Sequence, residues 1–319
     1  AWVHPTVMAL ADADVVADLA GICFSDGRGI PTLAYNVLMT GIPILLGTPV
    51  VKCSQAIGPT EEAITRTAAS WVLPHVSTIV ARGESTERHL EGLGLHNVRP
   101  GADLAFLLRT SAEDEAEARR LVGDDEYVVV APSAVVQEKV DADGATYVAT
   151  MAGVVRMVRA STGHRVVVAP HAARPGRPAS RMNDLPVCEE IVDEARDDGV
   201  VLLGGSPSAG VLRAVIAGAE ALVTSRFHGM VSGLATSTPT VVIGWSHKYL
   251  EVMRAFDQAE FVIDHQHLSP DAVVALTQEA LRDAEGIRAR LTAALPCVQE
   301  SALVSVEEVL AMTGGGEEP

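Results

Sequence analysis

Aromatic residues and basic charge are scarce in this chain. Phe, Trp and Tyr make up 4% of its 319 residues, so few side chains are available to stack against a nucleotide base. The 24 Lys and Arg against 41 Asp and Glu leave a formal net charge of −17. This balance argues against nucleic acid or an anionic membrane as nonspecific partners, because both require a basic face. It still permits a local site for an anion.

Long apolar runs and paired cysteines are also missing. No stretch approaches the roughly 20 apolar residues that span a membrane. The start of the chain lacks a basic region followed by an apolar run, so we expect no signal peptide. The four cysteines, Cys23, Cys53, Cys188 and Cys297, lie far apart, which indicates neither a zinc site nor a redox motif. We therefore expect a cytoplasmic protein with reduced cysteines and no bound metal.

Strands and helices are predicted to alternate along the whole chain, a pattern typical of parallel sheets covered by helices on both faces. The length and a hydrophobic content of 48% suit two α/β domains better than one. An acidic, alanine-rich stretch separates the two halves. We predict an N-terminal domain over 1–112, a linker over 113–125, a C-terminal domain over 126–290, and a C-terminal helix with a disordered tail over 291–319.

The most informative segment predicts a β-α-β unit in the second half. An apolar run of strand length covers 221–224, and small and apolar residues recur at helical spacing over 227–235. Pro239 ends this helix before a second strand over 240–243. The sequence therefore places Arg226 and His228 at a turn from a strand into a helix.

This turn is suited to bind an anion. The first turn of a helix offers unpaired N–H groups and the positive end of the helix dipole. Arg226 adds a planar fork that fits phosphate or carboxylate, and His228 can transfer a proton near neutral pH. The structural alternative is a salt bridge for Arg226 and a satisfied histidine at the start of a helix.

Four segments occur in the same order and rough spacing as in a known family. They are Ser54-Gln-Ala-Ile-Gly-Pro, Ala81-Arg-Gly-Glu-Ser, Gly101-Ala-Asp-Leu-Ala-Phe-Leu-Leu and Thr224-Ser-Arg-Phe-His-Gly. With them, the chain resembles the polysaccharide pyruvyl transferase family over most of its length. The resemblance implies a GT-B-like fold in which two Rossmann-like α/β domains face a cleft, with the donor site in the C-terminal domain and the acceptor side in the N-terminal one.

The resemblance also implies an activity. Members move the pyruvyl group of phosphoenolpyruvate onto two hydroxyls of a sugar in a cell-surface polysaccharide or its precursor, which forms a cyclic ketal. Arg226, Phe227 and His228 match the family's Arg-Leu-His motif, which contacts phosphoenolpyruvate, and we expect His228 to be the catalytic acid. Phosphoenolpyruvate is then a co-substrate and no cofactor is needed. The acceptor is a glycan or a lipid-linked sugar, which would bring the protein to the inner face of the membrane.

Other loops supply further candidates for substrate contacts. Arg82 follows a strand where the family has an arginine before acidic residues, and it can anchor a second anionic group or pair with Glu84 or Glu87. We also expect Ser133 and His171, each after a strand, to contact phosphoenolpyruvate. Ser25 and Asp26 lie in a glycine-rich loop and are candidate acceptor contacts.

The loop from Pro170 to Asp184 is predicted to face the same cleft. Asn183 and Asp184 precede a helix, and an N-cap is the favoured role for Asp184. Arg174, Arg177 and Arg181 form a basic cluster in an otherwise acidic chain. They lie over the donor site or in a solvated loop, since Pro and Gly surround them.

The chain departs from the family at its beginning. Family members start with a glycine- and asparagine-bearing loop well upstream of the equivalent of Val15, so we expect either that the first domain lacks its N-terminal units or that the sequence is truncated. Two other functions stay open. One is a GT-B glycosyltransferase or sugar-nucleotide epimerase that uses a UDP-sugar, and the other is a non-catalytic homologue that binds a glycan. Neither the acceptor sugar nor the oligomeric state follows from the sequence.

Overall fold

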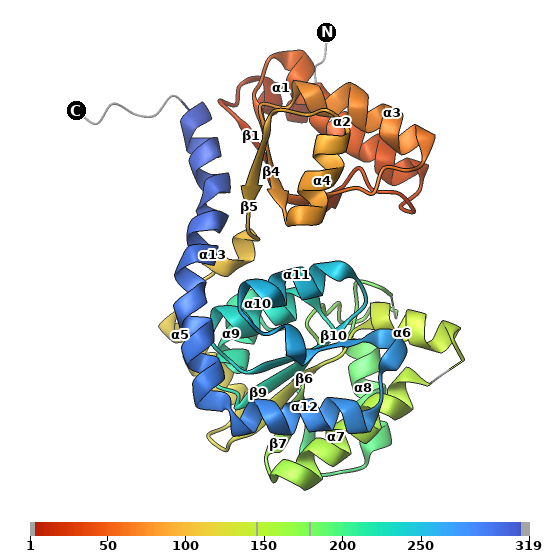
Figure 1. The fold of residues 1–319 in the computed structure, drawn as a ribbon, viewed down its shortest axis with the longest axis vertical. Helices are drawn as coiled ribbons and strands as arrows, with labels where there is room; N and C mark the ends of the chain where they lie inside the picture. The colour runs from red at the N-terminus through yellow and green to blue at the C-terminus, as the bar shows by residue number, and fades with distance from the viewer. Residues whose placement is uncertain (1–3, 145, 179, 314–319) are drawn as a thin grey trace, which may run out of the picture. The chain divides into compact units, whose positions relative to one another are not determined.

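The chain folds into two compact α/β units. The computed structural model describes residues 4–144, 146–178 and 180–313. The first unit comprises Ala1–Leu107 and Cys297–Pro319, and the second comprises Leu108–Pro296 (Figure 1). The final helix α13 (Ala284–Met312) contributes to both units, because the division falls inside it at Pro296.

The first unit contains a parallel sheet in the order β1-β3-β4-β5, with β2 paired to β3. Its elements are α1 (Pro5–Ala11), β1 (Val16–Asp18), β2 (Ile22–Cys23), α2 (Ile30–Leu46), β3 (Val50–Ile57), α3 (Ala63–Val72), η1 (Leu73–His75), β4 (Thr78–Arg82), α4 (Glu84–Gly92), β5 (Val98–Gly101) and η2 (Leu104–Leu107). Every residue of β3 is buried, as expected for a central parallel strand.

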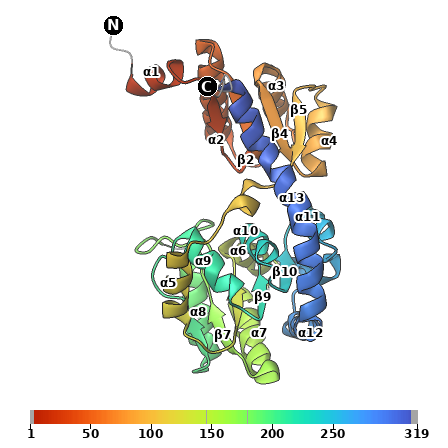
Figure 2. The ribbon, with the colours of Figure 1, turned by 90° about the vertical axis from the view of Figure 1, so that its left-hand side faces the viewer.

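Helices cover both faces of this sheet. On one face, side chains of α2, α3 and α4 form a common core with Ile79 and Ala81 of β4. On the other face lies the end of α13, where Ser305 Oγ is 3.2 Å from Ser54 Oγ and Glu308 accepts a 2.8 Å hydrogen bond from Thr78 (Figure 2). The C-terminal helix therefore completes the first unit.

The second unit contains a six-stranded parallel sheet in the order β11-β10-β9-β6-β7-β8. Its elements are α5 (Ala112–Val122), β6 (Tyr127–Ala131), α6 (Ala134–Ala142), α7 (Tyr147–Thr162), β7 (Arg165–Val168), α8 (Leu185–Ala195), β8 (Val200–Leu202), α9 (Ala209–Ala217), β9 (Ala221–Thr224), α10 (Phe227–Ala235), β10 (Thr240–Gly244), α11 (His247–Ala255), η3 (Ala259–Phe261), β11 (Val262–Asp264), η4 (His265–His267) and α12 (Pro270–Arg282). The strands are short apolar runs, which parallel packing between two helical layers favours.

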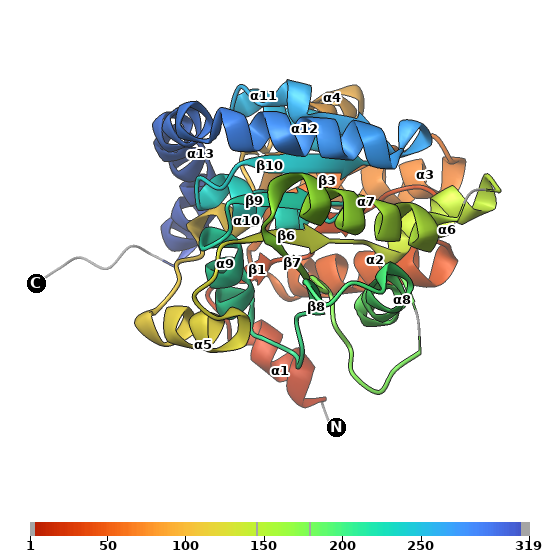
Figure 3. The same cartoon turned by 90° about the horizontal axis from the view of Figure 1, so that it is seen from below.

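The two faces of this sheet are covered by different helices. Helices α5 and α9 pack on one face around Val129, Val167 and Leu222. Helices α7, α8 and α12 pack together on the other face, and Figure 3 shows α12 on the side opposite α9 and α5. This arrangement is the doubly wound α/β organisation that the alternating pattern predicted.

The structure differs from the predicted domain organisation in two places. The expected linker over 113–125 is mostly helix α5, which begins at a capping box formed by Ser111 and Asp114 and packs against α9 in the second unit. The expected terminal segment over 291–319 is helical to Met312 and divides between the units, while its last residues, 314–319, lie outside the described residues. The acidic stretch was mistaken for a linker because its charged side chains form the solvent face of an amphipathic helix.

A smaller difference concerns the start of α9. Ser206 and Pro207 have the sequence pattern of an N-cap followed by a first-turn proline, but the cap is Ser208, whose hydroxyl accepts a 3.1 Å hydrogen bond from the Val211 amide.

The close packing of α10 on the sheet can be tested at Gly233. A Cβ atom at this position would come within 2.9 Å of Leu222 Cδ2 and would also collide with Thr240, so we expect Gly233→Ala to lower the free energy of unfolding by about 1–3 kcal/mol. Urea unfolding measures the change. The matched control is Gly41→Ala inside α2, where no atom lies within 4 Å, and which should be neutral or stabilising by up to about 1 kcal/mol. Equal effects of the two substitutions would contradict this packing.

Candidate functional site

The carboxyl ends of β6 and β9 mark the place where the sheet of the second unit changes direction. The chain runs from β6 outward to β7 and β8, then returns to the other side of β6 with β9 and continues to β10 and β11. Loops on either side of such a point diverge, and ligands of open α/β sheets bind there. The turn that carries Arg226 and His228 follows β9 at this point.

Arg226 is the N-cap residue of α10. Its backbone is extended, with φ −103° and ψ 131°, and its amide donates a 3.0 Å hydrogen bond to Thr224 Oγ1. The Arg226 side chain makes no capping bond to the helix. Arg226 therefore adds its own positive charge to that of the N-terminal end of the α10 dipole.

A buried carboxylate holds the guanidinium of Arg226. Nε donates a 2.8 Å hydrogen bond to Asp184 Oδ2, and Nη2 donates to Asp184 Oδ1. Nη2 also donates to the carbonyl oxygen of Arg181 at 2.8 Å. The side chains of Asp184 and Arg226 are 0% and 16% exposed. The salt bridge that the sequence left open for Arg226 is present, and it uses one edge of the guanidinium.

Asp184 does not act as the helix cap that we favoured for it. It occupies the N-cap position of α8, but its side chain makes no bond to that helix. Instead, Oδ1 accepts a 2.9 Å hydrogen bond from the Ala134 amide at the start of α6, and Oδ2 accepts one of 3.0 Å from the Ala172 amide after β7. The carboxylate thus connects the loops that follow β6, β7 and β9.

The preceding residue, Asn183, organises the loop before it. Its Nδ2 donates to the carbonyl oxygens of Arg174, Arg177 and Pro178 at 3.0–3.3 Å, and its Oδ1 accepts a 2.9 Å bond from the Arg174 amide. The side chains of Arg174 and Arg177 are exposed, and Arg181 pairs with exposed Glu138 at 3.2 Å. Asn183 therefore has a structural role, and the basic cluster faces solvent.

His171 and His228 lie on the same side of the sheet as Arg226. A Cβ atom on Gly229, in the first turn of α10, would be 3.5 Å from His171 Cδ2, so the His171 ring borders this turn. Burial, together with the neighbouring His228, Arg226 and Arg213, lowers the pKa of His171 to about 4, and burial is the largest cause. His228 is exposed, and its ring is edge-on to Phe227 at 5.6 Å. Near neutral pH, His171 is thus an uncharged neighbour of the predicted anion site.

Ser133 is more enclosed than we expected of a phosphate ligand. It is fully buried, and its Oγ accepts a 3.2 Å hydrogen bond from the Val135 amide as the N-cap of α6. Its own amide donates to the Tyr147 hydroxyl oxygen at 3.2 Å. The contact of Ser133 with phosphoenolpyruvate stays a prediction, whereas its cap of α6 is a feature of the fold.

Two buried tyrosines that sequence reasoning missed support the turn after β9. The Tyr147 hydroxyl lies 3.1 Å from Ser225 Oγ, and the Tyr249 hydroxyl donates a 3.0 Å hydrogen bond to the Ser225 carbonyl. Burial raises the pKa of both hydroxyls, so they stay protonated. The Tyr249 ring is also edge-on to Phe227 at 5.7 Å. These contacts hold the backbone next to Arg226 in place, and no local sequence pattern signals them because Tyr147 and Tyr249 are distant from Ser225 in the chain.

The remaining predicted residues belong to the first unit. The Arg82 guanidinium pairs with Asp103 and donates a 2.8 Å hydrogen bond to the Gly21 carbonyl at the carboxyl side of its sheet. Asp26 Oδ2 accepts hydrogen bonds from the amides of Glu61 and Glu62 at 2.6 and 3.2 Å. Burial acts to raise the pKa of Asp26, but these amide bonds, a hydrogen bond from Thr65 and the charge of Arg66 together outweigh it, and the pKa is lowered. Asp26 thus orders the start of α3, and the acceptor roles of Ser25 and Asp26 stay predictions.

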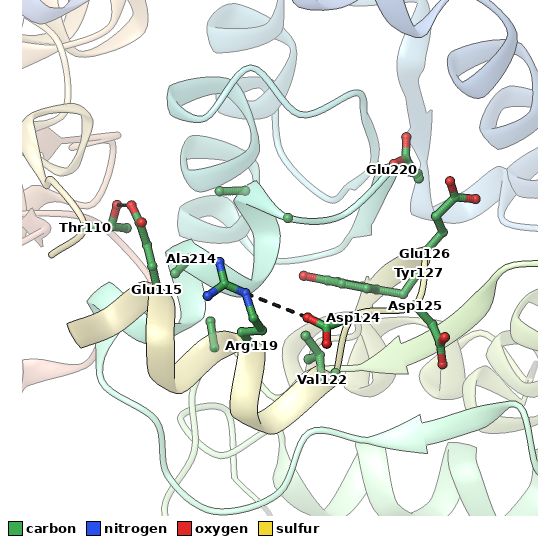
Figure 4. Close-up of a pocket in the computed structure, with 14 residues that line it drawn as sticks. Thr110, Glu115, Arg119, Val122, Asp124, Asp125, Glu126, Tyr127, Ala214 and Glu220 are labelled. Atoms are coloured by element: carbon green, nitrogen blue, oxygen red, sulfur yellow. Dashed lines mark hydrogen bonds and ion pairs between the residues drawn. The ribbon is translucent and has the colours of Figure 1, made fainter. Parts of the chain in front are cut away.

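A cavity in the second unit lies elsewhere. Its volume is about 460 Å³, and it opens at the amino ends of β6 and β9, beside Asp125, Glu126 and Glu220 (Figure 4). None of its lining residues belongs to the predicted site. Parallel strands place their ligand-binding loops at the carboxyl ends, so this acidic hollow is not the candidate site.

Neither a metal-binding cluster nor a membrane-spanning helix occurs in the described part of the chain. Over residues 4–144, 146–178 and 180–313, no group of three or more His, Cys, Asp or Glu side chains is arranged to hold a metal ion. Within the same ranges, no helix has the length and hydropathy needed to traverse a bilayer.

Comparisons with known proteins agree with this architecture. A family model described as polysaccharide pyruvyl transferase matches residues 9–247. The amylovoran biosynthesis protein AmsJ of Erwinia amylovora is 23% identical over 297 residues, which cover 90% of this chain and 70% of that protein.

Solved structures with a similar fold include two UDP-N-acetylglucosamine 2-epimerases. A putative UDP-N-acetylglucosamine 2-epimerase from Listeria monocytogenes superimposes with a TM-score of 0.67 at 11% identity, covering 98% of this chain and 78% of that one. The UDP-GlcNAc 2-epimerase from Neisseria meningitidis, bound to UDP-GlcNAc, gives 0.62 at 12% identity, with 96% and 80% covered. These likenesses establish a GT-B-like fold.

The lowered pKa of His171 predicts a pH dependence of stability. In the unfolded chain the ring titrates near its usual pKa of 6.5, whereas in the folded chain it titrates near 4. Between these values the unfolded state binds more protons than the folded state. The contribution of His171 to the free energy of unfolding is therefore fully present above about pH 6.5 and is lost as the pH falls toward 4. From about pH 7 to about pH 5, wild type should lose about 2 kcal/mol more than His171→Gln.

Urea unfolding of both proteins at the two pH values measures this difference. Carboxylates contribute equally to both proteins, so only the difference between them reports on His171. Parallel pH dependences would show that the folded protein does not keep His171 uncharged.

Proposed function

Because the chain belongs to the polysaccharide pyruvyl transferase family, a family of polysaccharide-modifying transferases, we propose that it transfers the pyruvyl group of phosphoenolpyruvate to a sugar. The acceptor is a unit of a cell-surface polysaccharide or its lipid-linked precursor, and the product is a cyclic ketal. The relative AmsJ is by its name an amylovoran biosynthesis protein, which supports a polysaccharide as the acceptor.

The observation that carries this proposal is the group of donors beside the first turn of α10. Arg226 brings a fixed positive charge, the helix brings its dipole, and His171 and His228 bring two imidazoles. Phosphoenolpyruvate carries a phosphate and a carboxylate, so it requires more than one anion contact together with a proton donor. This turn provides both within a few residues.

The reaction can be written with these residues in named roles. A proton from His228 adds to the methylene carbon, and one sugar hydroxyl attacks the adjacent carbon, which still bears the phosphate. The second hydroxyl then displaces phosphate and closes the ketal. Of the two hydroxyl protons, one replaces the proton given by His228 and the other leaves with phosphate. Arg226 and the α10 amides stabilise the charge that collects on the leaving group.

The use of a UDP-sugar is the second candidate function. This function is favoured by the fold that the chain shares with epimerases, one of which is bound to UDP-GlcNAc. At 12% identity this likeness supports the fold alone, and a uridine needs a stacking surface that a chain with 4% aromatic residues offers sparingly. We therefore keep UDP-GlcNAc as the competing ligand in the binding test.

Arg226 should be required for binding phosphoenolpyruvate. Isothermal titration calorimetry of wild type with phosphoenolpyruvate and with UDP-GlcNAc distinguishes the two functions. Arg226→Ala should weaken phosphoenolpyruvate binding at least about 100-fold, because it removes a charged hydrogen-bond donor and leaves the Asp184 carboxylate to repel the ligand. The matched control is Arg159→Ala, which breaks an ion pair with Asp197 elsewhere in the same unit. Binding of UDP-GlcNAc alone would overturn the proposal.

His228 should be required for turnover more than for binding. His228→Gln keeps a hydrogen-bonding side chain of similar size but cannot supply the proton, so we expect phosphate release to fall by about 100-fold to 10,000-fold. Binding of phosphoenolpyruvate should change by no more than about threefold. His164→Gln, at the amino end of β7 and so at the end of the sheet opposite the turn, serves as the control. Unchanged phosphate release in His228→Gln would exclude His228 as the acid.

A further inference from the structure

We propose that Asp184 is the positioning residue of the anion site, and that it determines which nitrogen of Arg226 meets the substrate. This inference rests on the proposed function, because it concerns the same site. Asp184 acts through Arg226 and is not placed against the reacting atoms.

The bonds of Asp184 account for both of its oxygens. Oδ1 accepts from the Ala134 amide and from Arg226 Nη2, and Oδ2 accepts from the Ala172 amide and from Arg226 Nε. All four partners are N–H donors. An asparagine would turn its own N–H group toward one of these donors, so only the carboxylate satisfies the arrangement.

This pairing decides what Arg226 can offer to a ligand. The Nε–Nη2 edge of the guanidinium faces Asp184, and Nη2 also donates to the Arg181 carbonyl. Among the described residues, no hydrogen bond is formed by Nη1. Arg226 therefore presents one nitrogen with two N–H groups, and a bidentate grip through Nε and Nη2 is not available to the substrate.

The same carboxylate fixes the surroundings of that nitrogen. Through the Ala172 amide it holds the backbone next to His171, and through the Ala134 amide it holds the first residue of α6. One buried group thus sets the spacing between the guanidinium and the His171 loop. Without it, the guanidinium would be free to turn, and the ordering of its side chain would have to occur when the anion binds.

A double-mutant cycle tests this role. We expect Asp184→Asn to weaken the binding of phosphoenolpyruvate by about tenfold to 100-fold in wild type, and by no more than about threefold in the Arg226→Ala background. The reason is that Asp184 has nothing to position once the guanidinium is gone, and neutralising its unpaired carboxylate in that background can only reduce its repulsion of the ligand. A residue that only supports the fold would weaken binding equally in both backgrounds, and that result would overturn the proposal.

The control is Asp197→Asn. Asp197 also accepts from an arginine, Arg159, and from a backbone amide, that of Gly199, but it lies before β8. It should leave binding unchanged, and circular dichroism should show that each variant is folded. Loss of binding in Asp197→Asn equal to that in Asp184→Asn would also overturn the proposal, because general destabilisation would then explain both.

A second variant applies if Asp184→Asn does not fold. Arg226→Lys keeps the positive charge but replaces the fork by one nitrogen, which cannot bond both Asp184 oxygens and a ligand together. Binding should fall by about tenfold or more, and retention within about threefold would show that charge alone suffices and overturn the proposal.

Inorganic phosphate, titrated in parallel, separates this inference from the proposed function. If wild type binds phosphate but not phosphoenolpyruvate, the proposed function fails and the cycle is completed with phosphate as the probe. If wild type binds both and Asp184→Asn binds them as tightly, only the role of Asp184 fails. Wild type that binds neither anion would overturn both.

Discussion

The site in the second unit depends on one buried carboxylate. Asp184 is removed from solvent, which costs several kcal/mol for an ion unless bonds replace the lost hydration. Two backbone amides and one guanidinium supply those bonds. Removing one partner of such a pair costs about 3–5 kcal/mol, because a charge is then buried alone. The loops after β6, β7 and β9 are thus held in one arrangement.

A second constraint acts on the turn itself. Tyr147 and Tyr249 hydrogen-bond to Ser225 from two different helices, so the residue next to Arg226 has little freedom. Buried polar networks of this kind favour a single geometry when every member is satisfied. Electrostatic stabilisation is strongest where the donors are ordered before the ligand arrives. The net charge of the chain is −17, so its overall charge does not attract an anion. The ordered donors at this turn provide local attraction for an anion instead.

The two units use arginine in the same way. In each, an arginine at the carboxyl end of a strand is paired with a largely buried aspartate: Arg82 with Asp103, and Arg226 with Asp184. Pairing orders the long side chain and leaves part of the guanidinium for other contacts. Asp103 follows its arginine in the sequence, whereas Asp184 precedes its arginine. Local sequence patterns reveal neither pairing, because the partners are far apart in the chain.

The sequence by itself determined the elements and the position of the turn. The strand β9 and the helix α10 have the predicted bounds, because a short apolar run, small residues at helical spacing and a closing proline are local signals. The ordered family segments likewise placed Arg226 and His228 together. Only the tertiary structure decided what those side chains contact. Asp184 lies 42 residues from Arg226 and 50 from Ala134, and such pairings arise from the strand order β9-β6-β7. Local periodicity carries no information about which loops that order brings together, and therefore a presumed helix cap became the centre of the site.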